Sequence, residues 1–383
     1  MSLTDVKHQP TAQRLFQRTL SSGRMSHAYI FHGPDGVGKE TFARGVAEVL
    51  LCGSACDVSL SAAEAEAVGL AKARVGCGSC ADCLGVRGDS HGDLHIVHRY
   101  LNRDHPEPEV RKRKALEMGV DVIRHFVIDP VGLKSAHGRA KVFIIREADR
   151  ITPQAQNALL KTLEEPPGPT YLILLVSAID RLLETTRSRC QSLRFDSLPT
   201  AFVASRLADL APDVSTDQRA WYAAASEGSL GLALESAEQG LFEINQTIVA
   251  GLSLLPQDRS GATLTVWTDS AKAVSDVYKE HDPDMSDTDV TRRGIKTVFR
   301  LAATWYADVL RRASGCTTIV NTLHAEAVAK SAGTIGAEAA AEAVNRIAKA
   351  GHHLDRNVNV QLCVETLLND LARLGIEAGA VSR

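Results

Sequence analysis

The sequence contains no long hydrophobic run. Its longest apolar stretch, "YLILLV" from Tyr171 to Val176, is far too short to cross a lipid bilayer. The first ten residues, "MSLTDVKHQP", lack the apolar core of a secretory signal. These two absences argue against a membrane or secreted protein, and we expect a cytoplasmic protein with no membrane partner.

A strong charge of one sign is also missing. The chain has 43 Lys and Arg against 46 Asp and Glu, which gives a formal net charge of −3. No overall field therefore draws it to nucleic acid, and any DNA contact must come from a local patch or a shared surface. Aromatic residues make up only 5% of the chain, and we find no stripe of interleaved basic and aromatic residues.

What the sequence does contain is the pattern of an α/β domain. At 383 residues the chain is long enough for two or three domains. The first half alternates short apolar runs with helical patterns such as 40–51, and most of the runs are apolar enough to be buried on both faces, as parallel strands are. The charged, proline-containing segment 103–114 is expected to be a solvated loop. We predict a doubly wound α/β domain over residues 1–198, with strands at 28–32, 93–98, 141–146, 171–176 and 192–195.

From about residue 200 onward the sequence shows only helical periodicity. A segment with one proline and two glycines, 251–261, predicts a hinge between two helical parts. We therefore expect a small helical domain at 199–253 and a second all-helical domain at 254–383. Amphipathic patterns in the second predict long helices suited to bundling or subunit contact, at 292–313 and 360–375.

The segment "HGPDGVGKET", residues 32–41, nearly matches a phosphate-binding loop. The usual pattern is Gly, four residues, Gly, Lys and then Ser or Thr, and its backbone N–H groups wrap a phosphate at the start of a helix. Glu40 stands where the Mg²⁺-ligating hydroxyl should be, and Thr41 comes one residue late. We predict a degenerate nucleotide loop made by Gly33, Pro34, Gly36, Val37, Gly38, Lys39, Glu40 and Thr41.

A second position of the same metal site also departs from the pattern. The acidic pair after the third strand should be Asp and Glu, which hold Mg²⁺ and polarise the attacking water. The sequence instead reads "FIIREAD", with Arg146 in the metal position and Glu147 in the position of the base. Because a guanidinium repels Mg²⁺, we expect that ATP or ADP can occupy the loop but that ATP is not hydrolysed there.

Three cysteines, Cys77, Cys80 and Cys83, follow one another as C-x₂-C-x₂-C. Four thiolates in a tetrahedron suit Zn²⁺, and a cytoplasmic chain has little other reason to crowd them. The fourth ligand is Cys52 or Cys56, and the zinc is expected to be structural because no open coordination position is implied. Histidines with ligand-like spacing are interpreted as core or surface residues: His91, His95 and His98.

Three stretches together resemble the bacterial clamp-loader AAA+ subunits of DNA polymerase III: "HAYIFHGPDGVGKETFA", "KVFIIREADRITPQAQNALLKTLEEPP" and "TTRSRCQ". The similarity covers about residues 8–240 clearly and the last third more loosely. It implies an AAA+ P-loop domain with an inserted zinc module at about 52–83, a helical lid domain and a helical collar for oligomerisation. In this family the "LLC" after the first helix supplies a zinc ligand, so the resemblance favours Cys52 over Cys56, although the gap before Cys77 is long.

The family includes an ATP-hydrolysing motor, gamma/tau, and a delta-prime stator whose own ATP site is commonly degenerate. Motor subunits carry a polar sensor and a lid arginine where this sequence has Ala178 and Gly231. Together with Glu40 and Arg146, these departures imply the delta-prime type. The "SRC" motif implies that Arg189 is an arginine finger, which reaches the ATP site of a neighbouring subunit and stabilises charge on the transferring phosphoryl group.

The resemblance therefore implies a stator of the clamp loader that helps to place the sliding clamp on primed DNA. The implied partners are the gamma/tau and delta subunits, the sliding clamp and, through the assembled complex, primer–template DNA. Two alternatives stay open. The chain could be a gamma/tau-type motor in which Glu40 ligates Mg²⁺ and Glu147 acts alone as the base, or a zinc-ribbon nucleic-acid-binding module.

Overall fold

The computed structural model describes residues 3–113, 115–255, 261–282, 285–355 and 358–381. The chain forms two compact units. The first consists of Met1–Pro199 together with Ser229–Gly231, and the second of Thr200–Gly228 together with Leu232–Arg383. The division of the helical half into a lid and a collar stays a prediction.

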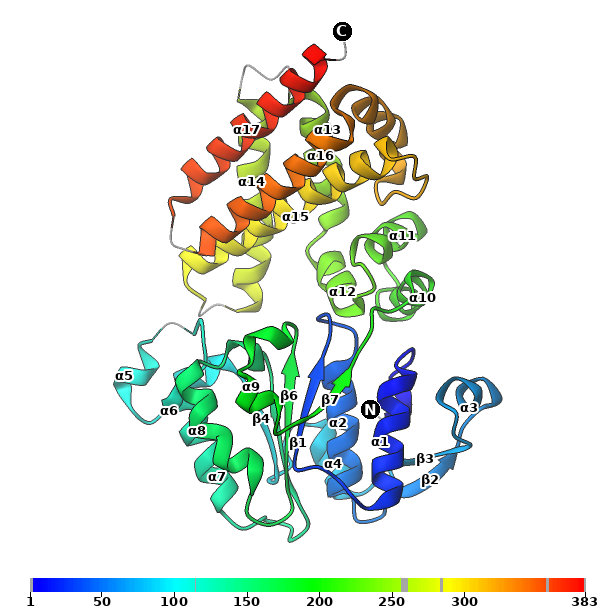
Figure 1. The fold of residues 1–383 in the computed structure, drawn as a ribbon, viewed down its shortest axis with the longest axis vertical. Coiled ribbons are helices and arrows are strands. Elements are labelled where there is room, and N and C mark those ends of the chain that lie inside the picture. The colour runs from blue at the N-terminus through cyan, green and yellow to red at the C-terminus, as the bar shows by residue number, and fades with distance from the viewer. Residues whose placement is uncertain (1–2, 114, 256–260, 283–284, 356–357, 382–383) are drawn as a thin grey trace. The chain divides into compact units, whose positions relative to one another are not determined.

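A parallel sheet forms the centre of the first unit (Figure 1). The strands expected from the sequence are confirmed as β1 (Ala28–His32), β4 (Leu94–Val97), β5 (Lys141–Ile145), β6 (Thr170–Val176) and β7 (Gln191–Arg194). Their order in the sheet is β4–β5–β6–β1–β7, and each neighbouring pair is parallel. Parallel pairing requires crossover connections, which place helices on the faces of the sheet.

The helix expected at 40–51 is confirmed as α2 (Lys39–Leu51), which begins directly after the glycine-rich loop. The other α-helices of the first unit are α1 (Pro10–Ser22), α3 (Ala62–Val68), α4 (Ala81–Arg87), α5 (Pro108–Arg111), α6 (Val120–Ile123), α7 (Asp129–Gly132), α8 (Pro153–Glu164) and α9 (Glu184–Arg187).

Alternate residues of β1 point to opposite faces of the sheet, and both faces are buried. On one face Tyr29 and Phe31 pack edge-on against Phe16 of α1 and Phe42 of α2, with ring centroids 5.8 and 5.6 Å apart. Ile30 lies in the core on the other face, together with residues of α6 and α8. Burial on both faces explains why the strand is continuously apolar rather than alternating.

The charged segment 103–114 is not a solvated loop throughout, which corrects the expectation from its composition. Arg99–Asp104 form a 3₁₀-helix and Pro108–Arg111 form α5. Val110 is buried, so the segment contributes to the core of the first unit. The proline at the first position of α5 suits a helix start, and charge counting did not reveal it. Lys114 lies outside the described residues.

The 24 residues between Cys52 and Cys77 form a small hairpin that was not predicted. Strand β2 (Cys56–Ser59) pairs antiparallel with β3 (Lys72–Val75), and α3 connects them. α3 begins at a capping box, in which the side chains of Ser61 and Glu64 each accept a hydrogen bond from the other residue's backbone N–H.

The described residues of the second unit form helices, as expected for the half after residue 200. Trp267 and Trp305 are buried in its core. The long helices expected at 292–313 and 360–375 are confirmed as parts of α15 and α17. The helices are α10 (Thr200–Leu210), α11 (Thr216–Ala225), α12 (Leu230–Glu238), α13 (Leu241–Leu254), α14 (Ala262–His281), α15 (Asp287–Ala313), α16 (Ala325–Asp355, with non-helical Gly336) and α17 (Val360–Val381).

The predicted hinge at 251–261 overlaps the end of α13, and its residues 256–260 lie outside the described part of the chain. Within the described ranges, no helix is both long enough and apolar enough to cross a membrane.

Candidate functional site

The glycine-rich loop connects the end of β1 to the start of α2. Gly33, Gly36 and Gly38 have φ angles of 144°, 70° and 101°, which glycine adopts without steric cost. At Gly33 a Cβ atom would also overlap the carbonyl of Phe195. The loop thus has the glycine-dependent backbone on which phosphate cradling relies.

Lys39 is the only ammonium group that the loop pattern itself supplies, and its side chain is 6% exposed. Its Nζ donates to the carbonyl oxygens of Gly33 and Pro34 and, at 3.1 Å, to Oδ1 of Asp35. Burial lowers the pKa of Lys39, and the Asp35 carboxylate partly offsets this effect. Lys39 is therefore held within the loop by the loop's own oxygen atoms.

Glu40 and Arg146 form an ion pair beside the loop. Oε1 of Glu40 also accepts from Nε of Arg44 at 2.9 Å, one helical turn further along α2. Arg44 in turn pairs with Asp89, Nη2 to Oδ2 at 3.1 Å, and this contact lowers the pKa of Asp89. The carboxylate that stands at the metal-ligating position is thus neutralised by two guanidinium groups.

Glu147, at the position of the catalytic base, is paired as well. Its carboxylate lies 3.0 Å from Nε of Arg99 and 3.3 Å from Nε of Arg150. Its backbone has a φ of 47°, an unfavourable conformation for a residue with a side chain. Two guanidinium groups occupy the oxygen atoms of Glu147, so this carboxylate is poorly placed to accept a proton from an attacking water.

The other two departures from the motor pattern bring no polar side chain to the loop. Ala178 follows β6 and precedes a 3₁₀-helix at Ile179–Arg181. Gly231 belongs to the first unit, and its N–H donates to the carbonyl oxygen of Gly36 at 3.1 Å. Neither residue can contact a phosphate through a side chain.

Arg189 lies just after α9, ahead of β7, and about a third of its side chain is exposed. Its Nε pairs with Glu164 at the end of α8, and its Nη1 donates to the carbonyl oxygen of Thr185 at 2.9 Å. These contacts fix the guanidinium while leaving it partly accessible. The next residue, Cys190, is partly buried, and burial raises its pKa to about 12.

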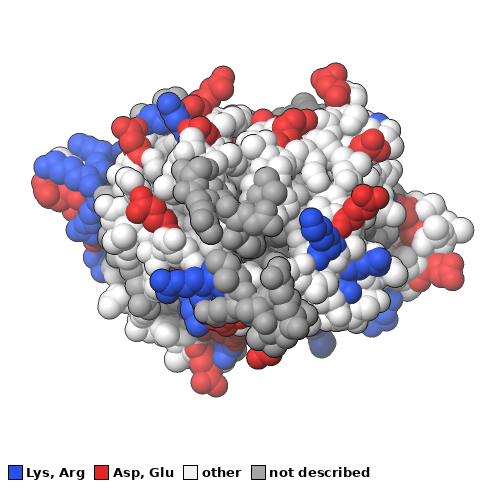
Figure 2. Space-filling model, turned by 90° about the horizontal axis from the view of Figure 1, so that it is seen from above, with Lys and Arg blue, Asp and Glu red and all other residues white. Residues whose placement is uncertain are grey.

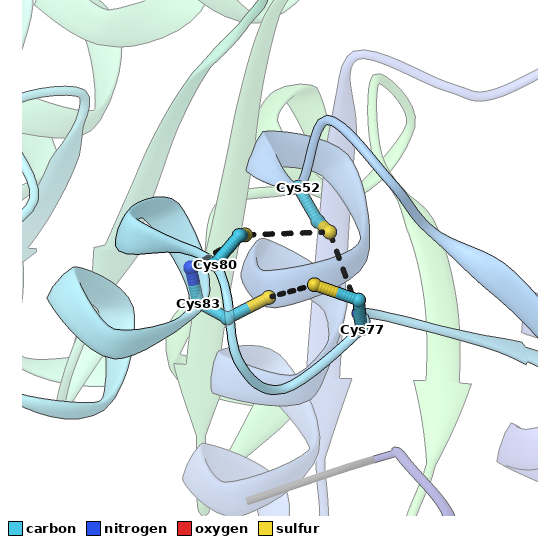
Figure 3. Close-up of side chains that lie close together, drawn as sticks. All are labelled: Cys52, Cys77, Cys80 and Cys83. Carbon is cyan, nitrogen blue, oxygen red and sulfur yellow. Dashed lines mark hydrogen bonds between the residues drawn. The ribbon is translucent and has the colours of Figure 1, made fainter.

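Four cysteine side chains point toward one another in the first unit (Figure 3). Cys52 caps the end of α2, and Cys80 and Cys83 lie at the start of α4. The Sγ atoms of Cys52 and Cys80 are 3.7 Å apart, and those of Cys77 and Cys83 are 3.9 Å apart. Zinc–sulfur bonds of about 2.3 Å in a tetrahedron place the sulfur atoms about 3.8 Å apart, so the four residues fit a zinc ion.

Backbone amides support thiolates in this cluster. Hydrogen bonds from the backbone of Ser79 and Cys80 lower the pKa of Cys77 to about 6. Burial raises the pKa of Cys52 and Cys83, so a bound cation would be needed to ionise them at neutral pH. Cys56 lies exposed on β2 and is not among the residues that come together.

The burial of the thiols predicts which of them react. With a metal ion on the four clustered cysteines, which would shield the Cys77 thiolate, we expect a thiol reagent at pH 8 to modify Cys56 and Cys316 first, because both are exposed. Cys190 should react slowly, since its raised pKa leaves almost no thiolate, and Cys363 is buried. Mass spectrometry of the alkylated native chain tests this expectation. Rapid modification of Cys190 would contradict it.

A second group with metal-ligating atoms consists of Asp82, His91 and His137. Nδ1 of His91 accepts a hydrogen bond from the backbone N–H of Asp93 at 3.0 Å, so the neutral ring carries its proton on Nε2. Nε2 is the atom that faces Asp82, at 3.4 Å, and a protonated nitrogen is no metal ligand. This agrees with the interpretation of His91 as a core histidine.

Sequence reasoning missed the residues that neutralise the site. Arg44 follows Glu40 at the i, i+4 spacing of helical ion pairs, and this spacing could have indicated the contact. Asp89 and Glu164 come from distant parts of the chain, and no local pattern relates them to Arg44 or Arg189.

A parallel sheet with a glycine-rich loop between its first strand and the next helix defines the first unit as an α/β domain of the P-loop class. Residues 8–199 match a family described as "DNA polymerase III, delta subunit". That match spans half of the chain. The chain therefore belongs to this family of DNA polymerase III subunits, and it is delta-prime-like, which confirms the resemblance stated from its motifs.

Individual relatives agree with this assignment. The delta-prime subunit of Bacillus subtilis is 31% identical over 52% of this chain, and the match covers 51% of that protein. The delta-prime subunit of Pseudomonas aeruginosa is 30% identical over 66% of this chain, and the match covers 69% of that protein. The tau subunit of Escherichia coli is 28% identical over 68% of this chain and 37% of its own length. The chain thus spans only about half of the Bacillus subtilis relative that it matches.

Among solved structures, a DNA polymerase III gamma-subunit-related protein from Thermotoga maritima aligns over 95% of this chain and 99% of its own, with 13% identity and a TM-score of 0.44.

Proposed function

We propose that this chain is a delta-prime-like stator of a DNA polymerase III clamp loader. It would not hydrolyse ATP itself, and it would complete the ATP site of a neighbouring gamma/tau-type subunit with Arg189. Its partners would be that subunit, a delta subunit and the sliding clamp, with primer–template DNA contacted through the assembled complex.

The observation that carries the proposal is the ion pair between Glu40 and Arg146. In a hydrolysing site the corresponding residues hold Mg²⁺, which bridges the phosphates and neutralises the developing charge. Here Arg146 is a cation and Glu40 is its ion-pair partner, so these two residues do not fit a magnesium ion. Glu147, which stands where the base would activate the attacking water, is paired with Arg99 and Arg150. This pairing also argues against hydrolysis in the loop.

The position of Arg189 supports the second half of the proposal. A guanidinium that serves another subunit must be held in place and yet remain accessible. Glu164 and Thr185 hold one side of Arg189, while about a third of its side chain is exposed. An arginine finger acts through its charge and its directional N–H donors, so a guanidinium that is already oriented lowers the cost of reaching the transition state.

A structural zinc ion on Cys52, Cys77, Cys80 and Cys83 is part of the proposal. The spacing of the sulfur atoms fits a tetrahedral zinc, and the four ligands leave no position for a substrate. Zinc would hold the end of α2, the β2–β3 hairpin and α4 together. We expect no direct role for the metal in ATP chemistry.

The net charge and the face drawn in Figure 2 give no support to a separate nucleic-acid-binding module. On the face drawn in Figure 2, basic and acidic side chains are interspersed, and several of opposite sign lie side by side. With a net charge of −3, the isolated chain lacks the electrostatic footprint of a DNA-binding protein.

Reconstitution tests the proposal. We expect the chain to co-elute with gamma/tau-type and delta-type subunits of the same organism in size-exclusion chromatography. Clamp- and DNA-stimulated ATP turnover should require its presence. The chain alone should show no ATP turnover above background. Hydrolysis by the isolated chain that is lost in Lys39→Ala would instead identify a motor of the gamma/tau type.

A further inference from the structure

We infer that the glycine-rich loop binds a nucleoside diphosphate or triphosphate without a divalent cation, because the pair of Arg146 and Glu40 stands in the place of Mg²⁺. This inference rests on the proposed function and deepens it. It assigns the degenerate loop a ligand in a defined chemical form, the metal-free nucleotide, rather than treating the loop as a relic.

The loop retains donors for phosphate oxygens. Among the described residues no hydrogen bond uses the backbone N–H of Gly36 or of Gly38 as its donor. Helix α2 begins directly after Gly38 and has no side-chain cap, so its N-terminal dipole and first-turn N–H groups face the loop. Lys39 adds a buried ammonium whose present partners, oxygens of residues 33–35, are the ones that a phosphate would replace.

Arg146 keeps one side-chain donor unused within the described part of the chain. Its Nη2 is taken by Glu40, but its Nε is buried and has no hydrogen-bond partner among the described residues. Glu40 directly follows Lys39 in the sequence. Its ion pair therefore connects the Arg146 guanidinium to the start of α2, beside the loop. A buried nitrogen donor without a partner is costly, so a ligand oxygen that reached Nε of Arg146 would gain a hydrogen bond there.

The same geometry disfavours a metal ion. Mg²⁺ prefers carboxylate, hydroxyl and water oxygens in an octahedron of about 2.0–2.1 Å bonds. The Glu40 oxygen that would have to serve already accepts from both Arg146 and Arg44. A divalent cation beside Arg146 would also be repelled by its charge, so a nucleotide that carries Mg²⁺ should fit less well than the free nucleotide.

Isothermal titration of the full chain with ADP, ATP and inorganic pyrophosphate, in EDTA and in MgCl₂, tests this inference. We expect saturable binding of ADP and ATP in EDTA that Mg²⁺ does not strengthen, and weaker binding of pyrophosphate. Lys39→Ala should weaken binding by at least about tenfold, because it removes the loop's ammonium. Binding that is at least about tenfold tighter in MgCl₂ would overturn the inference, as would the absence of saturable binding in both conditions.

A double variant is expected to make nucleotide binding depend on Mg²⁺. Glu40→Ser with Arg146→Asp recreates the hydroxyl and carboxylate of an ordinary metal site, and we expect it to bind ATP at least about tenfold more tightly with Mg²⁺ than in EDTA. The matched charge reversal Arg18→Asp, at an exposed position of α1, should leave the metal-independent binding unchanged. If the double variant does not fold, Arg146→Ala provides the test. It should stay metal-independent and bind several-fold more weakly.

These outcomes separate the inference from the proposed function. A chain that binds no nucleotide could still lend Arg189 to a neighbour, and only the inference would fail. A chain that binds and hydrolyses Mg²⁺–ATP would contradict both.

Discussion

Replacing Cys83 with serine is expected to abolish binding of the proposed zinc and to lower the melting temperature of the chain by about 10 °C. Cys83 is fully buried at the start of α4, and the hairpin of β2 and β3 has little core of its own. Loss of one ligand removes the cross-link that joins these elements to the end of α2. Structural zinc sites commonly contribute several kcal/mol to folding, and about 1 kcal/mol shifts the melting temperature of a unit of this size by about 2–4 °C.

The matched control is Cys56→Ser. Cys56 lies close to Cys52 in the sequence but is exposed on β2 and outside the cluster. We expect this variant to keep both its zinc, measured by inductively coupled plasma mass spectrometry, and its melting temperature. Zinc loss in Cys56→Ser with zinc retained in Cys52→Ser would show that Cys56 is the fourth ligand. A purified chain without any zinc would contradict the proposed metal.

Arg189→Ala is expected to slow ATP hydrolysis at the neighbouring subunit's site by about 10³-fold. The guanidinium would stabilise charge on the transferring phosphoryl group, and no other part of this chain is proposed to replace it. Total turnover of the reconstituted complex should then fall to the level that its other sites supply. The measurement is clamp- and DNA-stimulated ATP turnover of complexes assembled with wild-type or variant chain.

Arg187→Ala is the control for this change. Arg187 is the last residue of α9, two positions before Arg189, and its side chain pairs at 3.5 Å with the exposed Asp180. Both substitutions remove one partly exposed arginine from the same surface. If Arg187→Ala slowed turnover as much as Arg189→Ala, the effect would come from the surface as a whole and not from an arginine finger.

The fold of the first unit could be predicted because its strands carry a local signature. "AYIFH", "KVFII" and "YLILLV" are buried on both faces of a parallel sheet, so their residues are continuously apolar. The long helices around 292–313 and 360–375 were predictable from their amphipathic period. In both cases the residues that become buried form a regular pattern within one short stretch of sequence.

The hairpin between Cys52 and Cys77 was not predictable in the same way. β2 and β3 are short, mostly exposed strands without a continuous apolar run. The capping box at Ser61 and Glu64 was the one local signal, and it marks α3. The clustering of the four cysteines could be predicted, because three of them lie within a seven-residue segment, 77–83.

The site was only partly predictable. The motif positions identified Glu40 and Arg146 as departures, but not that the two side chains pair with each other across 106 positions of sequence. The contact depends on β5 lying in the same sheet as β1, which is a property of the folded domain. The partner of Arg189, Glu164, was likewise brought into reach by the packing of α8 and α9.

This chain is proposed to contribute an arginine to a neighbour's ATP site while its own loop does no hydrolysis. The most direct test is the clamp- and DNA-stimulated ATP turnover of the reconstituted complex with Lys39→Ala in this chain alone, beside the Arg189→Ala complex. Turnover that is unchanged by Lys39→Ala and reduced by Arg189→Ala is the predicted result. Turnover that falls with Lys39→Ala and is unaffected by Arg189→Ala would show that the chain is itself an ATPase.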